Sequence, residues 1–299
     1  MLDTLHWWLT SPFDYAFMRR ALVACLALSL TAPILGVLLT LRGMGQMGEA
    51  LSHAIMPGVA IAFMLAGFSL PLMMFGGVLA GLVTVALAGG VTQFSGLRED
   101  AAMASLFLIA MAGGVTIVSH SGSALDLGHV LFGSILAVDD RTLGLVALGS
   151  STLLVGLAIS FRALVVECLD PLFLTLQGRH AGWTHALFMV LVVIGLVMGF
   201  QTLGTLMAAG LMLLPAAAAR YWSQRLEGMI AIAIGIALAS SMVGLLVSYH
   251  AGLPSGPSII LLAGLGYGMS LVLGPYRGLR ANASRPKRGI GSRHAGQLR

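Results

Sequence analysis

The sequence predicts an all-α integral membrane protein, and its composition and its apolar segments both support this. Hydrophobic residues make up 58% of the 299 residues, charged residues only 9%, and the mean hydropathy is +0.96. Soluble domains carry roughly 25% charged residues, so this composition excludes an ordinary soluble fold. The 39 glycines and 17 methionines are typical of membrane helices that pack closely through small residues.

Apolar segments along the chain predict about nine transmembrane helices. They cover residues 21–41, 50–66, 70–93, 101–119, 142–160, 184–201, 203–219, 229–250 and 257–274. The cut after residue 201 rests on Gln201, Thr202 and Gly204, because one uninterrupted helix over both segments would be unusually long. The run from Val130 to Val138 is too short to cross a membrane, so it is expected to be re-entrant or to lie on the surface.

Nine crossings place the two termini on opposite sides of the membrane. With the C-terminus in the cytoplasm, thirteen Lys and Arg residues lie inside and three outside, as the positive-inside rule requires. We therefore expect an outside N-terminus, a polytopic domain over residues 1–276 and a disordered, basic cytoplasmic tail over residues 277–299. The basic residues form no stripe, so the expected partner of the tail is anionic membrane lipid and no nucleic-acid partner is predicted.

The most informative polar residues are Glu49 and His53, four positions apart within the apolar stretch from Leu39 to Phe63. On a helix they share one face. Ionisable residues at membrane depth usually line a bundle interior or a water path, so the pair predicts a transport site for a metal ion. The same spacing also fits a hydrogen bond that braces the helix, and two residues cannot complete a zinc site, which needs three or four ligands.

A second group of acids and imidazoles falls on the predicted outer side, where it could form a vestibule for an arriving ion. Its members are His120, Asp126, His129, Asp139, Asp140 and His250. Asp126 is the candidate for gathering the metal ion, and on a helix it would share a face with His129. Each of these residues, taken alone, also fits a solvated loop residue or a helix cap.

The predicted inner loop from Phe161 to Trp183 contains a short helix of its own. Asp170 and Pro171 provide a helix start, and Gly178 provides a stop. Such a helix could dock on a cytoplasmic partner or simply rest on the membrane surface.

Six sequence blocks occur in one order between about Arg20 and Gly274. They are Gly48–Ala54 (GEALSHA), Glu99–Asp100, Leu131–Val138, Asp170–Gly178, Gly204–Arg220 and Tyr249–Ile259. In type and order these blocks resemble the permease subunits of ATP-binding-cassette importers for zinc, manganese and iron. Glu49 departs from the aspartate usual in that family, and His129 is not part of its pattern.

The resemblance implies a type II importer bundle in a bacterial inner membrane. Two copies of the chain would form the pathway, a cytoplasmic ATPase dimer would drive it, and an extracytoplasmic protein would deliver the metal ion. Glu49 and His53 would hold the ion, and the helix from Asp170 to Gly178 would couple to the ATPase. The chain has no P-loop sequence, so it is expected to be a transporter subunit without enzymatic activity or a bound cofactor.

Zinc is the first expectation for the transported ion, because the pathway candidates mix nitrogen and oxygen; manganese and ferrous iron accept similar ligands. Two other classes remain as alternatives. A proton-coupled secondary transporter would normally show internal repeats, which are not evident here. An intramembrane metalloprotease would carry H-E-x-x-H, which the sequence lacks.

Overall fold

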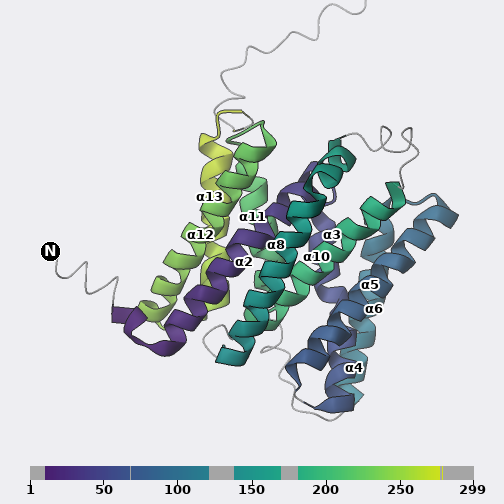
Figure 1. Ribbon diagram of the computed structural model, residues 1–299, viewed down its shortest axis with the longest axis horizontal. Coiled ribbons are helices and arrows are strands. Elements are labelled where there is room, and N and C mark those ends of the chain that lie inside the picture. Colours follow the sequence, from purple (N-terminus) through teal and green to yellow (C-terminus); the bar gives the residue numbers. More distant parts are fainter. Residues whose placement is uncertain (1–10, 68, 121–137, 170–180, 277, 279–299) are drawn as a thin grey trace, which may run out of the picture.

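The computed structural model describes residues 11–67, 69–120, 138–169, 181–276 and 278, and this part of the chain is helical throughout, without strands (Figure 1). Its elements are η1 (Ser11–Asp14), α2 (Ala16–Leu41), α3 (Gly45–Ala54), α4 (Met56–Ala66), α5 (Leu70–Ser95), α6 (Glu99–His120), α8 (Asp140–Leu169), α10 (Ala181–Leu203), α11 (Thr205–Ala219), α12 (Leu226–Ala251) and α13 (Ser255–Leu273). The predicted all-α class is confirmed. The predicted tail falls, apart from Gly278, outside the described residues.

Each of the nine predicted segments corresponds to helix, and eight spans among the described residues are long and apolar enough to cross a membrane. One of these spans joins α3 and α4, from Gly45 to Ala66. The ninth segment, α11, has 15 residues. At about 1.5 Å per residue it is shorter than the roughly 30 Å hydrocarbon core of a bilayer.

A break between α10 and α11 is present as predicted, but it falls at Gly204, because α10 continues to Leu203 beyond the predicted cut after residue 201. Gly204 has φ 82°, a conformation that favours glycine, and the chain reverses there. After the reversal α11 packs back along α10. The two helices are close there, since a Cβ added to Gly199 would lie 2.8 Å from the Cβ of Ala208. Of the short apolar run at residues 130–138, only Val138 lies within the described residues.

The start of α2 and the end of α13 lie at opposite ends of the bundle (Figure 1). Tyr15, just before α2, lies against Tyr249 near the end of α12, with ring centroids 6.0 Å apart. At the other end, the Tyr276 N–H donates to the carbonyl oxygen of Tyr221 (3.2 Å). The neighbouring Arg220 donates through Nη1 to the carbonyl oxygen of Thr40, in the last turn of α2 (3.2 Å). An odd number of crossings requires this arrangement.

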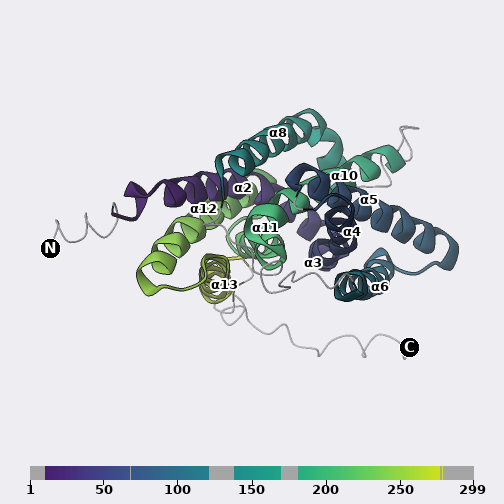
Figure 2. The ribbon, with the colours of Figure 1, turned by 90° about the horizontal axis from the view of Figure 1, so that it is seen from below.

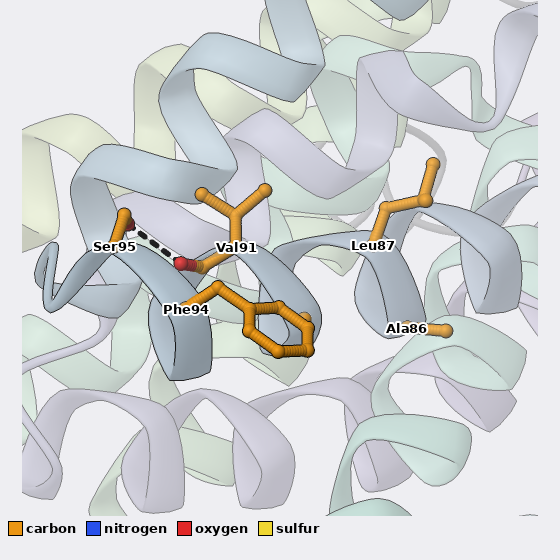
Figure 3. A pocket seen from close by; sticks show the side chains of 6 residues that line it. Ala86, Leu87, Val91, Phe94 and Ser95 are labelled. Carbon is orange, nitrogen blue, oxygen red and sulfur yellow. Dashed lines mark hydrogen bonds between the residues drawn. The ribbon is translucent and has the colours of Figure 1, made fainter.

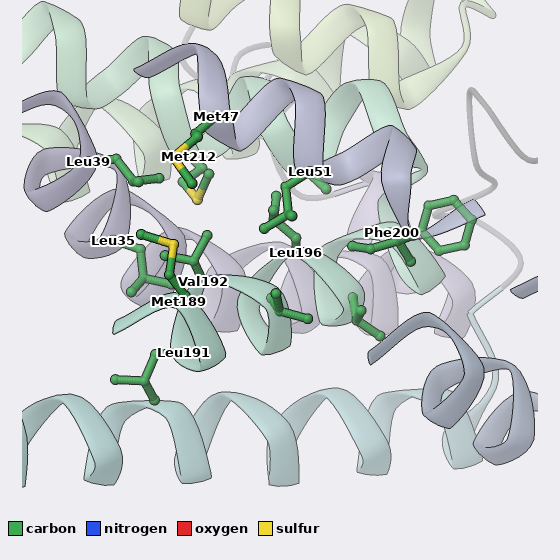
Figure 4. Packing of buried hydrophobic residues seen from close by; sticks show 14 of the residues in the cluster. Leu35, Leu39, Met47, Leu51, Met189, Leu191, Val192, Leu196, Phe200 and Met212 are labelled. Atoms are coloured by element: carbon green, nitrogen blue, oxygen red, sulfur yellow. The ribbon is translucent and has the colours of Figure 1, made fainter. Parts of the chain in front are cut away.

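The bundle centres on α2, α10 and α11, with α12 and α13 on one side and α4, α5 and α6 on the other (Figure 2). A cluster of buried apolar side chains fills the space among α2, α3, α10 and α11 (Figure 4), including Leu35, Leu39, Met47, Leu51, Met189, Val192 and Met212. Helices α2 and α11 approach so closely that a Cβ on Gly36 would lie 1.9 Å from the carbonyl oxygen of Met212. Helix α3 therefore packs against two helices, α2 and α11, that are themselves in close contact.

Candidate metal pathway site

Helix α3 follows α2 after a turn of only three residues, Arg42, Gly43 and Met44. Gly43 has φ 75°, the left-handed conformation that lets glycine end a helix and reverse the chain. The Met44 N–H donates to the Leu39 carbonyl oxygen (2.9 Å) and closes the turn. The direction of α3 is therefore determined directly by the end of α2.

Helix α3 is amphipathic, and its two faces have different surroundings. Its buried residues are Met47, Gly48, Leu51, Ser52 and Ala54. Met47 and Leu51 belong to the apolar cluster shared with α2, α10 and α11, and α3 also packs against α6. The other face presents the exposed side chain of Glu49 and, one turn later, the half-buried ring of His53. The two predicted ligands therefore share one face of a helix within a membrane-spanning segment.

In a purely structural pair the two side chains would be hydrogen-bonded, and this is not the case for Glu49 and His53. The ring of His53 packs against Phe107 of α6, with centroids 5.6 Å apart, and its Nδ1 is buried without a hydrogen-bond partner in the described part of the chain. No hydrogen bond joins the Glu49 and His53 side chains among the described residues. The bracing hydrogen bond that the spacing also allowed is not formed.

The described part of one chain supplies only these two candidate ligands at this place. Among the described residues, no group of three or more His, Cys, Asp or Glu side chains could hold a metal ion. A hollow on α5, lined by Ala86, Leu87, Gly90, Val91, Phe94 and Ser95, is apolar (Figure 3). Its one hydroxyl, that of Ser95, donates to the Val91 carbonyl oxygen (2.6 Å), so the hollow offers no metal ligand.

The remaining predicted site residues divide into two groups. Asp126, Asp170, Pro171 and Gly178, together with His129, lie outside the described residues. The two described acids of the predicted vestibule, Asp139 and Asp140, have other partners.

Asp139 is the N-terminal cap of α8. Its Oδ1 accepts hydrogen bonds from the Thr142 hydroxyl and from the Thr142 N–H (2.8 Å), and these bonds hold the pKa of the Asp139 carboxyl below its usual value. Asp140 pairs with Arg20 of α2, with 3.2 Å between Nη1 and Oδ1. Of the two roles expected for Asp139, helix cap and metal ligand, the structure therefore favours the helix cap.

A buried ionic cluster at the other end of α8 was not predicted. Glu167 of α8 binds Arg42, and the Nη1 of Arg42 lies 3.1 Å from Nδ1 of His185 in α10. Neither Glu167 nor His185 was singled out from the sequence. The available signal was that Glu167 is the one acid of α8 besides Asp140 at its first position, and an acid in an apolar stretch needs a partner when it is buried.

Fold and site together define a multi-span membrane protein with an unsatisfied acid and imidazole on one embedded helix face. The profile of the ABC 3 transport family matches residues 14–274, and the chain belongs to this family. The resemblance to importer permeases is thereby confirmed.

Similar proteins come from several bacteria. The manganese import system permease protein ScaB of Streptococcus gordonii is 32% identical over 88% of this chain and 93% of its own length. A probable iron transport system membrane protein of Haemophilus influenzae is 28% identical over 85% of this chain and 93% of its own length.

Solved structures show the same fold. PsaBC from Streptococcus pneumoniae in complex with Fab matches with a TM-score of 0.81 and 28% identity, covering 91% of this chain and 97% of the matched chain. A putative metal-chelate type ABC transporter in an inward-facing conformation matches at a TM-score of 0.63 and 16% identity, a likeness of fold alone.

Proposed function

We propose that this chain is the membrane permease of an importer that moves a divalent metal ion past Glu49 and His53. One observation carries the assignment: an exposed carboxylate and an imidazole nitrogen without a partner share the face of α3, within a membrane span of an ABC 3 family protein. A carboxylate is costly against lipid, so this face needs water, an ion or another protein surface opposite it.

A second copy of the chain is the proposed cover for this face. Two copies related by a two-fold axis would bring two Glu49 and two His53 side chains together, enough for the three or four ligands that a zinc-like ion takes. Few and weakly held ligands also suit a pathway, because the ion must leave as readily as it enters.

Manganese is the preferred ion in this proposal, ahead of ferrous iron and of zinc. Relatives carry the names of manganese and iron transport systems, and a site of carboxylate oxygen and imidazole nitrogen suits all three ions. The additional methylene of Glu49, relative to the aspartate usual in the family, keeps the oxygen ligand while changing its reach.

The energy source in this proposal is a pair of cytoplasmic ATPases, and an extracytoplasmic binding protein delivers the metal ion. The C-terminus is then cytoplasmic and the N-terminus outside, in a bacterial inner membrane. The segment from Asp170 to Gly178, which follows α8, is proposed to dock on the ATPase, and Asp126 to gather the ion outside.

The test is uptake of radiolabelled manganese, iron and zinc into vesicles that contain this chain, its ATPase and its binding protein. Accumulation of one ion that requires ATP supports the proposal and names the substrate. Accumulation that follows a proton gradient without ATP contradicts it and favours a secondary transporter.

A further inference from the structure

Three charged or polar side chains meet at the turn between α2 and α3. One comes from the turn itself and the other two from helices α8 and α10. Arg42 follows α2, Glu167 lies in the last turn of α8, and His185 lies in the first turns of α10. The Arg42 Nη2 donates to Glu167 Oε1, and the Arg42 Nη1 lies 3.1 Å from His185 Nδ1. Because a guanidinium only donates, His185 Nδ1 is the acceptor in this contact.

The ion pair of this cluster is buried, although it lies at an end of the bundle, and His185 is half-buried beside it. The Glu167 side chain is 4% exposed and that of Arg42 is 11% exposed. The Arg42 guanidinium also stacks on the ring of Phe188, 4.9 Å from its centroid, and Phe188 is fully buried. A buried ion pair of this kind gives little net stability compared with apolar packing, but removing one partner leaves a costly unpaired charge.

The cluster joins two parts of the molecule that the proposed function connects. Glu167 and His185 lie on the two helices that enter and leave residues 170–180, the segment proposed to dock on the ATPase. Arg42 lies three residues before α3 and seven residues before Glu49. Only Gly43 and Met44 separate Arg42 from α3, so the path from Arg42 to that helix is short.

A second arginine holds the other side of the same turn. Arg220, after α11, donates to the carbonyl oxygen of Thr40 (3.2 Å), and the Sγ of Cys168 in α8 lies 3.9 Å from the carbonyl oxygen of Leu38. The end of α2 is therefore held between α11 and α8, and only on the α8 side is the attachment an ion pair between side chains.

We propose that Arg42, Glu167 and His185 are positioning residues that carry movements of α8 and α10 to helix α3, and so couple ATP hydrolysis to the movement of the metal ion. This inference rests on the proposed function. It assigns a role to Glu167, a buried acid that the pathway itself does not use. Ion pairs suit this role, because their strict geometry transmits a displacement that a loosely packed apolar contact would absorb.

The test compares the number of metal ions imported per ATP hydrolysed by the complete complex in vesicles. Glu167→Gln is expected to lower this ratio at least threefold while the complex still assembles and hydrolyses ATP. The charge exchange Arg42→Glu with Glu167→Arg is expected to recover more than half of the loss. Glu227→Gln is the matched control, because Glu227 is an exposed acid at the start of α12, close after Arg220; its ratio is expected to be unchanged.

An unchanged ratio in Glu167→Gln, or a lower yield of folded protein with a normal ratio, overturns the inference and leaves the cluster a structural contact. Absence of ATP-driven uptake by the unsubstituted complex contradicts the proposed function instead. A second measurement, which needs no uptake, then decides the inference.

That measurement places spin labels at the exposed positions Gln46 of α3 and Arg162 of α8, in a chain whose Cys25 and Cys168 are replaced by alanine. With the link intact, the distance between the labels is expected to keep one narrow distribution with and without nucleotide, because the two helices move together. Glu167→Gln is expected to broaden or shift it. Identical distributions in both chains overturn the inference.

Discussion

Two groups of polar side chains lie at and near the turn between α2 and α3, and they differ in whether the charged side chain has a partner of opposite charge. Arg42 is paired with the buried Glu167 and contacts His185, although Glu167 Oε2 is buried without a hydrogen-bond partner among the described residues. Glu49 is exposed, and the Nδ1 of His53 has no partner among the described residues. An ion-paired group holds helices in place, whereas an unsatisfied group on a membrane helix is available to an ion.

The sharpest way to break this comparison is to remove the unsatisfied group. Glu49→Gln and His53→Ala are each expected to lower ATP-dependent metal uptake at least about tenfold, because each removes a ligand, while membrane abundance stays normal. Gln46→Ala, one turn earlier on the exposed side of α3, serves as the control and is expected to retain uptake. Near-normal uptake in both ligand variants would exclude Glu49 and His53 from the pathway.

Removing one member of the ion-paired group is expected to affect stability first. Arg42→Ala leaves the carboxylate of Glu167 buried and unpaired, a cost of about 3–5 kcal/mol in the free energy of unfolding. The measurement is thermal unfolding of the purified chain in detergent. Arg162→Ala, at an exposed position of α8, is expected to change the midpoint little; equal midpoints for the two variants would mean that the cluster contributes no more than a surface charge.

The support under both groups can be tested at Gly36. A Cβ there would lie 1.9 Å from a backbone oxygen of α11, so Gly36→Ala must separate α2 from α11 and is expected to cost about 1–3 kcal/mol. At Gly89 of α5 nothing lies within 4 Å of the same atom. Gly89→Ala is therefore expected to leave stability undiminished, since alanine favours helix; a loss as large as that of Gly36→Ala would show that crowding is not the cause.

The smallest effect is expected at Asp139, a carboxylate that also has partners but whose capping hydrogen bonds are exposed to solvent. Its pKa is lowered by the bonds from Thr142, so its contribution to stability is present above the usual pKa of an aspartate and is lost as pH falls through the lowered value. Asp139→Asn keeps a capping side chain without this titration. Unfolding midpoints measured between neutral and acidic pH are expected to fall slightly less in the variant, and parallel curves would contradict a role for the charge.

Several expectations could be drawn from the chain alone because they depend on local order. Hydropathy predicted the nine helical segments, since a backbone in lipid must satisfy its own hydrogen bonds. Gly204 marked the break between α10 and α11 because it interrupts an apolar run that is too long for one helix. Glu49 and His53 were placed on one helix face by a spacing of four residues.

The tertiary structure alone decided which polar residues have partners. Arg42 and Glu167 are 125 residues apart in the sequence, and no local pattern indicates that the ends of α2 and α8 meet. The same holds for Arg20 and Asp140, 120 residues apart, and for the contact of Gly36 with α11. A sequence determines which segments become helices, because hydrophobicity and spacing act over a few turns, but pairing between helices depends on how distant segments pack.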